Sequence, residues 1–242
     1  MKILFKYCLI IASVFLLFAC GKDTEDVSGI TYYVEFDIIG GNPTIIQVGE
    51  PYEDQGVVAT LQGENVTSTI TVTYNDVDYE NMGLYKIEYT SLPNADGLIS
   101  RAVRDVIVCN PNVTVNVAGE YVGLVGTKRN VISTGAEVLY PGFHSSITYL
   151  APGFFQINDF FAGYYAERVY PEYGYKIMGM SGFFAMDEDN NINLISSYID
   201  AWGDSLDKLE NGKYDPATGV ITWDAYYAGS MVFHVVMAIE EE

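Results

Sequence analysis

The sequence is poor in cysteine, histidine and basic residues. Its 242 residues include three Cys and two His, and 12 Lys plus Arg stand against 32 Asp plus Glu, so the formal net charge is −20. Without a basic stripe to neutralise phosphates, nucleic acid is not expected as a partner, and electrostatic docking to anionic lipid is disfavoured for the same reason. Apolar residues nevertheless make up 49 % of the chain, which is enough for a packed core and excludes global disorder.

The scarce cysteines and histidines also limit the chemistry that the chain can perform. Cys8 and Cys20 belong to the N-terminal region and Cys109 stands alone, so we expect neither a disulfide in the mature chain nor a cysteine-based metal site. His144 and His234 are far apart in sequence, which makes a zinc site improbable. We therefore expect no metal and no cofactor.

Motifs that mark catalysis are equally scarce. There is no Gly-x-Ser-x-Gly, no phosphate loop and no dinucleotide fingerprint in the sequence. Residues 187–193 place oxygen-bearing side chains at alternate positions, as a calcium loop does, but Ile192 replaces the required Gly and Tyr198 the required Glu, which favours a hairpin turn. No catalytic residue is predicted and the protein is not expected to be an enzyme. Only a pair of carboxylates converging in a cleft would make it one.

Residues 1–19 have the pattern of a lipoprotein signal peptide. Two lysines precede an apolar run at 7–18, which is too short to span a bilayer as a mature helix. Residues 17–20, Leu-Phe-Ala-Cys, then read as a lipobox, which predicts lipid attachment at Cys20 by acyl chains such as palmitate. Each buried methylene of such a chain contributes about 0.8 kcal/mol to membrane binding. An ordinary secretory signal or an uncleaved anchor are the alternatives.

An acidic tether follows the predicted lipidation site. Residues 20–29 are polar, and the stretch Gly21–Asp26 resembles the surface-export signal of Bacteroidetes lipoproteins. Removal of residues 1–19 takes away two Lys and no acidic residue, which leaves 10 basic against 32 acidic residues and a net charge of −22. We therefore expect a protein of the outer membrane that is lipid-anchored and faces the cell exterior.

From residue 30 onward the hydrophobic pattern is typical of strands. In Leu84–Thr90, for example, Tyr85, Ile87 and Tyr89 share one face and polar side chains the other. Several such runs separated by turn residues predict a β-sandwich over residues 30–110. A proline just beyond this range ends the pairing, and a second domain is predicted for residues 111–242.

Three segments of the first domain resemble one family. Val48–Ala59 is similar to the "GxxYxDxGVxA" segment of bacterial surface Ig-like domains, Gly83–Tyr89 to their "GxYxVxY" strand, and Arg101–Val108 to their closing strand. The resemblance implies an Ig-like β-sandwich at 30–110 that serves as a spacer or presentation module.

The second domain is expected to be a larger antiparallel β-barrel or sandwich, so the predicted fold class is all-β. Alternation and turn residues predict eight strands, one of them over 174–186 and the last over 230–239. Residues 204–211 carry a capping Asp and end before a Gly, which predicts a short helix.

This second domain also resembles a known group. Ile157–Tyr165, Ala201–Ser205 and Lys213–Trp223 are similar to segments of Bacteroides outer-membrane lipoproteins encoded beside SusC/SusD-type nutrient importers. The resemblance implies an accessory lipoprotein whose partner is a SusC/SusD-type outer-membrane importer complex, and whose possible ligand is an oligosaccharide or oligopeptide.

Residues 140–175 contain twelve Tyr or Phe, which have two interpretations. They form the core and rim of a β domain, or some of them form a stacking platform for sugar rings or peptide side chains. Neighbours such as Phe160-Phe161 point to opposite faces of a strand, so some aromatic rings are expected outside the core. The predicted ligand-binding residues are Asp159, Tyr164, Tyr165, Tyr173 and Trp202.

The sequence thus favours a non-catalytic surface lipoprotein that binds or presents a ligand for an importer. The alternative is a structural or adhesive surface module without a soluble ligand, in which the aromatic rings are buried.

Overall fold

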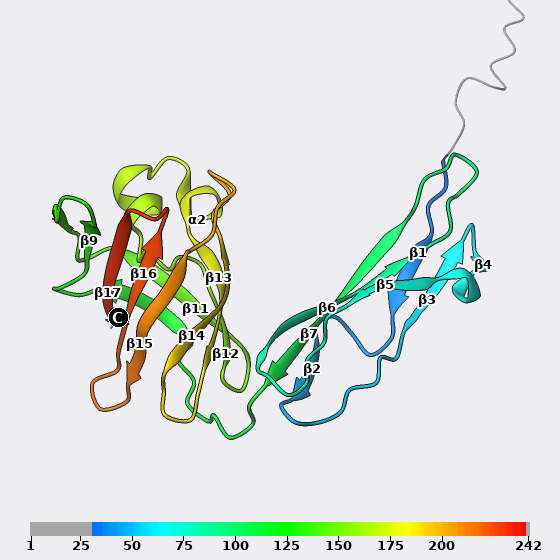
Figure 1. Cartoon of the computed structure of the whole chain (residues 1–242), viewed down its shortest axis with the longest axis horizontal. Coiled ribbons are helices and arrows are strands. Elements are labelled where there is room, and N and C mark those ends of the chain that lie inside the picture. Colours follow the sequence, from blue (N-terminus) through cyan, green and yellow to red (C-terminus); the bar gives the residue numbers. More distant parts are fainter. Residues whose placement is uncertain (1–30, 241–242) are drawn as a thin grey trace, which may run out of the picture.

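The computed structural model describes residues 31–240, which form two β-rich domains in succession (Figure 1). The predicted signal peptide 1–19, the tether 20–29 and the lipid-attachment residue Cys20 lie outside the described residues. Within residues 31–240, no helix combines the length and apolar character needed to cross a membrane.

The first domain is a sandwich of two sheets, as the period-two pattern predicted. One sheet has the order β1-β3-β4 and the other the order β2-β7-β6-β5, in which β2 runs parallel to β7. A 3-10 turn, η1, precedes β5. The bounds are β1 Glu35–Ile38, β2 Thr44–Gln47, β3 Val57–Leu61, β4 Glu64–Asn65, η1 Thr67–Thr69, β5 Thr71–Asn75, β6 Gly83–Thr90 and β7 Arg101–Cys109.

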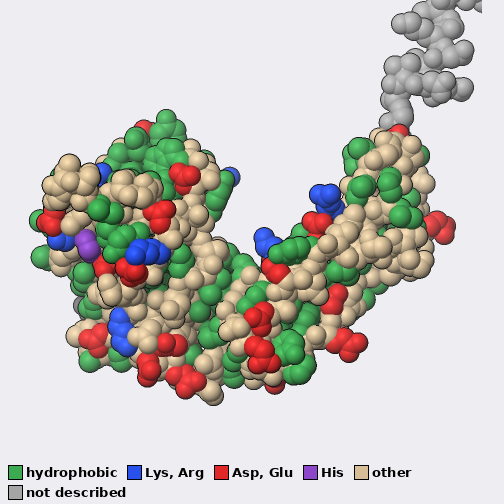
Figure 2. Space-filling model, in the orientation of Figure 1, with side chains coloured by type: hydrophobic (Ala, Val, Ile, Leu, Met, Phe, Trp, Pro, Cys, Tyr) green, Lys and Arg blue, Asp and Glu red, His purple; other side chains and the backbone are tan. Residues whose placement is uncertain are grey.

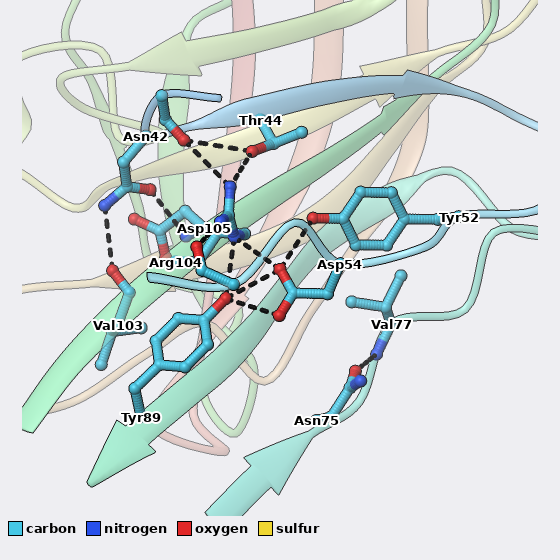
Figure 3. A network of polar contacts seen from close by, with 12 residues as sticks. Asn42, Thr44, Tyr52, Asp54, Asn75, Val77, Tyr89, Val103, Arg104 and Asp105 are labelled. Carbon is cyan, nitrogen blue, oxygen red and sulfur yellow. Dashed lines mark hydrogen bonds and ion pairs between the residues drawn. The ribbon is translucent and has the colours of Figure 1, made fainter. Parts of the chain in front are cut away.

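A buried arginine joins the two sheets of this sandwich (Figure 3). Arg104 on β7 is inaccessible to solvent, and its Nε lies 2.9 Å from Asp54 Oδ1 and 3.0 Å from the Tyr89 hydroxyl. The same guanidinium donates to Thr44 Oγ1 at 2.8 Å and to the Gly56 carbonyl at 2.7 Å. All of these partners of Arg104 belong to the first domain. We therefore interpret the cluster as structural: it holds the segment that leads into β3 against β7, and it is not a binding site.

The second domain is one ten-stranded antiparallel sheet that curls into a half-barrel. Along the curl the order is β14-β13-β12-β11-β8-β17-β16-β15, with β9 and β10 attached to the first half of β17. An isolated bridge from Asn191 to Lys213 links β14 to β15. The bounds are β8 Gly119–Gly123, β9 Lys128–Val131, β10 Glu137–Leu139, β11 His144–Ala151, β12 Phe154–Ile157, β13 Ser181–Met186, β14 Ile192–Tyr198, β15 Lys208–Asp215, β16 Val220–Tyr227 and β17 Met231–Ile239.

Two expectations for local structure were wrong. The strand expected over 174–186 begins only at Ser181, because the π-helix η2 (Tyr164–Val169) and the helix α2 (Gly174–Met178) lie between β12 and β13. Residues 204–211 form no helix and instead lead into strand β15, which pairs with β16. A short isolated helix is marginal in water, so pairing with β16, which continues past an irregularity between Glu210 and Lys213, outweighs the capping signal.

The two domains meet in a small apolar joint. Ile107 and Cys109 at the end of β7 share a buried cluster with Ala151 and Phe154 of the second domain. Gly153 turns between β11 and β12 at a φ of +67°, and an added Cβ there would lie 2.7 Å from the Met186 carbonyl. The same Cβ would lie 3.2 Å from Cε of Met82 in the first domain, so glycine lets the hairpin tip pack closely against both β13 and the first domain.

Polar contacts reinforce the joint. The side-chain amides of Asn110 and Asn112 each donate to Glu188 at 3.1 Å. The bond from Asn110 thus joins the end of the first domain to the second, and the bond from Asn112 holds the same Glu188 within the second domain.

Candidate functional site

Most of the aromatic residues between 140 and 175 form the core of the half-barrel. Phe160 packs edge-on against Trp223 of β16 at 5.7 Å, and Phe161 stacks on Phe233 of β17 at 4.0 Å between ring centroids. For these residues the core interpretation is the correct one. The fully or nearly buried members of this core are Tyr140, Phe155, Phe160, Phe161, Tyr164 and Tyr165, whereas Phe154 is buried in the joint between the domains.

Asp159 lies in this core and organises the backbone. Its carboxylate accepts the backbone N–H groups of Phe161 and Gly163 at 2.9 Å and of Met180 at 3.0 Å. Burial raises the pKa of Asp159 to about 7, and the three amide donors oppose this rise. Because the side chain is inaccessible, Asp159 shapes the turn that starts η2 and has no surface to offer a ligand.

Tyr164 is also an interior residue. Its ring packs edge-on against Tyr140 at 4.9 Å, and the guanidinium groups of Arg129 and Arg168 lie 5.3 and 5.4 Å from its centroid. With only 4 % of its surface exposed, it supports the neighbouring rings rather than facing solvent.

Three exposed aromatic residues gather at the end of the domain that carries η2 and α2, and we call them the aromatic patch: Tyr170, Tyr173 and Trp202. The N–H of Tyr173 donates to the Tyr170 carbonyl at 3.1 Å, and the ring centroids of Tyr170 and Trp202 are 6.3 Å apart. Trp202 is 43 % exposed and Tyr173 54 %. Hydrophobic side chains cover this end of the larger domain in Figure 2.

Buried rings hold the aromatic patch in place. Tyr165 contacts Trp202 edge-on at 5.0 Å and stacks against Tyr170 at 6.3 Å, so it forms the base of the patch. Tyr227 of β16 lies 6.5 Å from Trp202 and donates from its hydroxyl to Asp204 at 3.1 Å. Aromatic faces fixed in this way offer contact area at little cost in conformational entropy.

The structure therefore separates the sequence-predicted residues into two groups. It brings Tyr165 and Trp202 into contact and leaves Tyr173 exposed next to Tyr170, to which its backbone N–H donates, whereas Asp159 and Tyr164 are buried. Sequence reasoning did not select Tyr170, although it belongs to the same aromatic-rich stretch. Tyr170 differs from its buried neighbours because its ring is exposed and lies near Trp202, which is 32 residues away in sequence. This contact cannot be read from the local sequence.

The two histidines are placed on different strands, each beside a carboxylate. His144 on β11 has Nδ1 3.0 Å from Glu167 Oε2, and this carboxylate raises the pKa of His144. His234 on β17 has Nδ1 2.6 Å from Asp224. Among the residues that the structure describes, no group of three His, Cys, Asp or Glu side chains is arranged to hold a metal ion. Asp187 accepts hydrogen bonds from Asn191 and from the N–H of Asp189, as expected for a hairpin turn.

Fold and site together define a two-domain all-β protein, in which an Ig-like sandwich precedes a half-barrel with an aromatic end. A family model for bacterial surface protein Ig-like domains matches residues 36–108, and a model for a C-terminal domain matches residues 110–238. The solved lipoprotein BT2262 from Bacteroides thetaiotaomicron is 31 % identical, over 85 % of this chain and 100 % of that chain, with a TM-score of 0.47. The chain belongs to the family of that lipoprotein.

Two more distant structures come from ZmpB of Clostridium perfringens. One contains CBM51-2 in complex with GlcNAc and INT domains, and is 15 % identical over 51 % of this chain and 28 % of that chain, with a TM-score of 0.27. The other contains the M60 catalytic domain with CBM51-1 and CBM51-2, at 16 % identity, 54 % and 14 % coverage and a TM-score of 0.29. These likenesses are too weak to support an inference about fold or ligand. A search of curated proteins finds no match.

Proposed function

We propose that the protein is a cell-surface lipoprotein that assists a SusC/SusD-type nutrient importer. Acyl chains on Cys20 hold it in the outer membrane, facing the cell exterior, and it binds or presents an oligosaccharide or oligopeptide without catalysing a reaction. Three things support this: the lipobox at residues 17–20, a lipoprotein relative in the same family, and an Ig-like domain of the bacterial surface type.

The observation that carries the proposal is the aromatic patch. Trp202 and Tyr173 are 43 % and 54 % exposed at one end of the second domain, and Tyr165 and Tyr227 pack against Trp202. A monomeric protein gains nothing in stability from leaving such rings exposed, and clustered exposed aromatics are typical of binding surfaces.

Calorimetric titration of the full chain in detergent with oligosaccharides and oligopeptides tests ligand binding. Trp202→Ala should weaken binding by about thirtyfold or more, since an aromatic anchor contributes about 2 kcal/mol or more. Tyr74→Ala is the matched control, because Tyr74 is a similarly exposed aromatic residue of the first domain. Binding that is equal in both variants and the wild type would contradict a ligand role for the patch.

The partner and the location are tested in cells. Detergent pull-down with the native chain should recover a SusC/SusD-type pair, and protease treatment of intact cells should degrade the chain. Complete protection from protease would contradict an outward-facing location, and recovery without any importer component would contradict the accessory role.

Burial of most aromatic residues favours the second candidate, a structural or adhesive surface module. Fluorescence quenching by acrylamide tests which candidate is correct, because it reports how accessible each tryptophan is to solvent. The chain has two tryptophans: Trp223 is buried in the core and Trp202 lies in the patch. A single accessible tryptophan in the purified protein, shielded once the importer is added, would favour docking to the importer through the patch. Two shielded tryptophans in the isolated protein would favour the structural module.

A further inference from the structure

A depression, here called the polar pocket, opens on the outward face of β11–β13 beside α2. It has a volume of about 390 Å³, and the residues that matter for its chemistry are Ser146, Thr148, Gln156, Asn158, Lys176 and Ser181. None of the three residues of the aromatic patch lines it. Helix α2, which carries Lys176, begins directly after Tyr173 of the patch, so the two features flank the same helical turn.

The strand register explains why polar side chains meet here. Ser146 and Thr148 are two residues apart on β11 and face outward, whereas Ile147 between them belongs to the core. Thr148 lies opposite Gln156 of β12, and the side-chain oxygen of Asn158 accepts the N–H of Ser146 at 2.8 Å. Hydroxyl and amide groups from neighbouring strands therefore share one face.

Several of these groups retain free hydrogen-bonding capacity. Within residues 31–240, no hydrogen bond to another residue involves the hydroxyl of Thr148, the amide of Gln156 or the ammonium of Lys176, and Asn158 uses only its oxygen. Lys176 also forms no ion pair with the carboxylates of the described residues. The lining contains no Asp or Glu, although the chain as a whole carries a net charge of −20.

The wall that carries Lys176 is fixed in position. The hydroxyl of Tyr175 lies 2.7 Å from the His144 carbonyl and 2.6 Å from Glu167 Oε1, which ties α2 to β11 and η2. At the end of α2, a Cβ on Gly179 would lie 2.5 Å from the Asn158 carbonyl, so glycine is needed for the close approach to β12. The polar pocket is thus preformed rather than assembled by a ligand.

We propose that the polar pocket binds a hydroxyl-rich saccharide unit that carries a negative charge. Hydroxyl and amide side chains can exchange donors and acceptors with sugar hydroxyls, and the Lys176 ammonium can pair with a carboxylate or sulfate group. None of the lining residues is an Asp or Glu, although Glu120 lies opposite Ser146 in the ladder between β8 and β11. This inference goes beyond the proposed function, because it assigns a second site and a ligand class without using the aromatic patch.

The test uses the full chain in detergent and calorimetric titration with three tetrasaccharides. Tetragalacturonate carries carboxylates, a chondroitin sulfate tetrasaccharide also carries sulfates, and maltotetraose is the neutral probe. At least one acidic probe should bind, and maltotetraose should bind more weakly by about tenfold, as expected for the loss of one charge-assisted hydrogen bond. Preference between the two acidic probes identifies the anionic group.

Variants locate the site. Lys176→Gln should weaken binding of the acidic probe about tenfold and reduce its salt dependence, whereas Gln156→Ala should weaken binding and leave the salt dependence unchanged. Both residues are exposed, so the variants should fold. Lys208→Gln is the matched control, because it removes the same charge from β15, where Lys208 pairs with Glu210.

Two results would overturn the proposal: no binding of either acidic probe at millimolar concentration, or acidic binding that Lys176→Gln and Gln156→Ala leave unchanged. Trp202→Ala keeps this test separate from the proposed function. Loss of binding in Trp202→Ala alone would support the aromatic patch and overturn the polar pocket, whereas loss in Lys176→Gln and Gln156→Ala alone would support the pocket independently of the patch.

Discussion

At the scale of the residue, Asp159 combines full burial with three backbone hydrogen bonds. In Asp159→Asn one side-chain oxygen can still accept from Phe161 and Met180, but the NH₂ group then faces the N–H of Gly163. The new NH₂ group and the N–H of Gly163 are both donors, so neither has a partner in the core. This should lower the free energy of unfolding by about 1–3 kcal/mol. Urea denaturation of the variant beside Asp200→Asn, an exposed control, measures this loss.

The pH dependence of that loss has a definite sign. Burial raises the folded-state pKa of Asp159 to about 7, above its ordinary value, so its contribution to stability is fully present at low pH and falls as the pH rises through about 7. The stability difference between the wild type and Asp159→Asn should therefore shrink between about pH 4 and pH 7. A difference that is constant or grows over this range would mean that the three amide donors outweigh desolvation.

At the scale of the element, Glu167 links η2 to both β11 and α2. Its carboxylate lies 3.0 Å from His144 Nδ1 and 2.6 Å from the Tyr175 hydroxyl. In Glu167→Gln the pKa of His144 should fall toward its ordinary value, because the group that raises it most is removed. Nuclear magnetic resonance titration of the His144 ring measures the shift, with the His234 resonance as internal reference.

The stability change in Glu167→Gln should depend on pH in a fixed direction. A raised folded-state pKa stabilises the protein below the ordinary pKa of histidine, and the stabilisation disappears as the pH rises through the folded value. The variant should therefore lose more stability near pH 5.5 than near pH 8, by less than about 1 kcal/mol because the pair is partly exposed. An equal loss at both pH values would show that the hydrogen bond from Tyr175, whose pKa is raised and which does not titrate in this range, dominates.

Strands of the first domain could be predicted from the sequence, whereas the helices η2 and α2 could not. Alternation in Leu84–Thr90 was sufficient to predict strand β6, because its partners follow from strand pairing. The contacts of Asp54 and Gly56 with the buried Arg104 were not predicted, because they join segments about 50 residues apart in sequence. Helices η2 and α2 escaped prediction, since Gly163 and Gly179 allow turns and approaches that only the packed barrel reveals. Each glycine packs closely against backbone atoms about 20 residues away in sequence, at His144 and Asn158 respectively. The periodicity of neighbouring residues does not indicate such long-range contacts.

The candidate site was predictable in part for the same reason. Tyr165, Tyr173 and Trp202 were selected as aromatic residues in a dense region, and the structure places them at one end of the domain. Asp159 was selected for its neighbourhood, yet the curl of the sheet encloses it. Sequence spacing identifies the residue types, whereas the direction in which the sheet curls decides which of them meet solvent.

At the scale of the whole molecule, the joint between the domains sets their mutual orientation and also buries a thiol. Cys109 is 2 % exposed, and burial raises its pKa, so both access and thiolate formation oppose its reaction. Phe154 is the largest side chain of the second domain in this cluster and stacks on Phe183 at 6.1 Å. Its removal should leave a cavity beside Cys109 and cost about 3–5 kcal/mol of stability at the joint.

Phe154→Ala should therefore increase the rate at which a thiol reagent labels Cys109 by about tenfold or more, because opening of the joint limits the reaction. The full chain in detergent is labelled over time, and mass mapping of peptides assigns the modified residue to Cys109. Val125→Ala, at a position 91 % exposed in the second domain, is the control and should leave the rate unchanged. Fast labelling of the wild type would mean that the joint opens freely, and the Ig-like domain would then act as a hinged spacer. Slow labelling that Phe154→Ala does not accelerate would mean that the first domain alone buries the thiol.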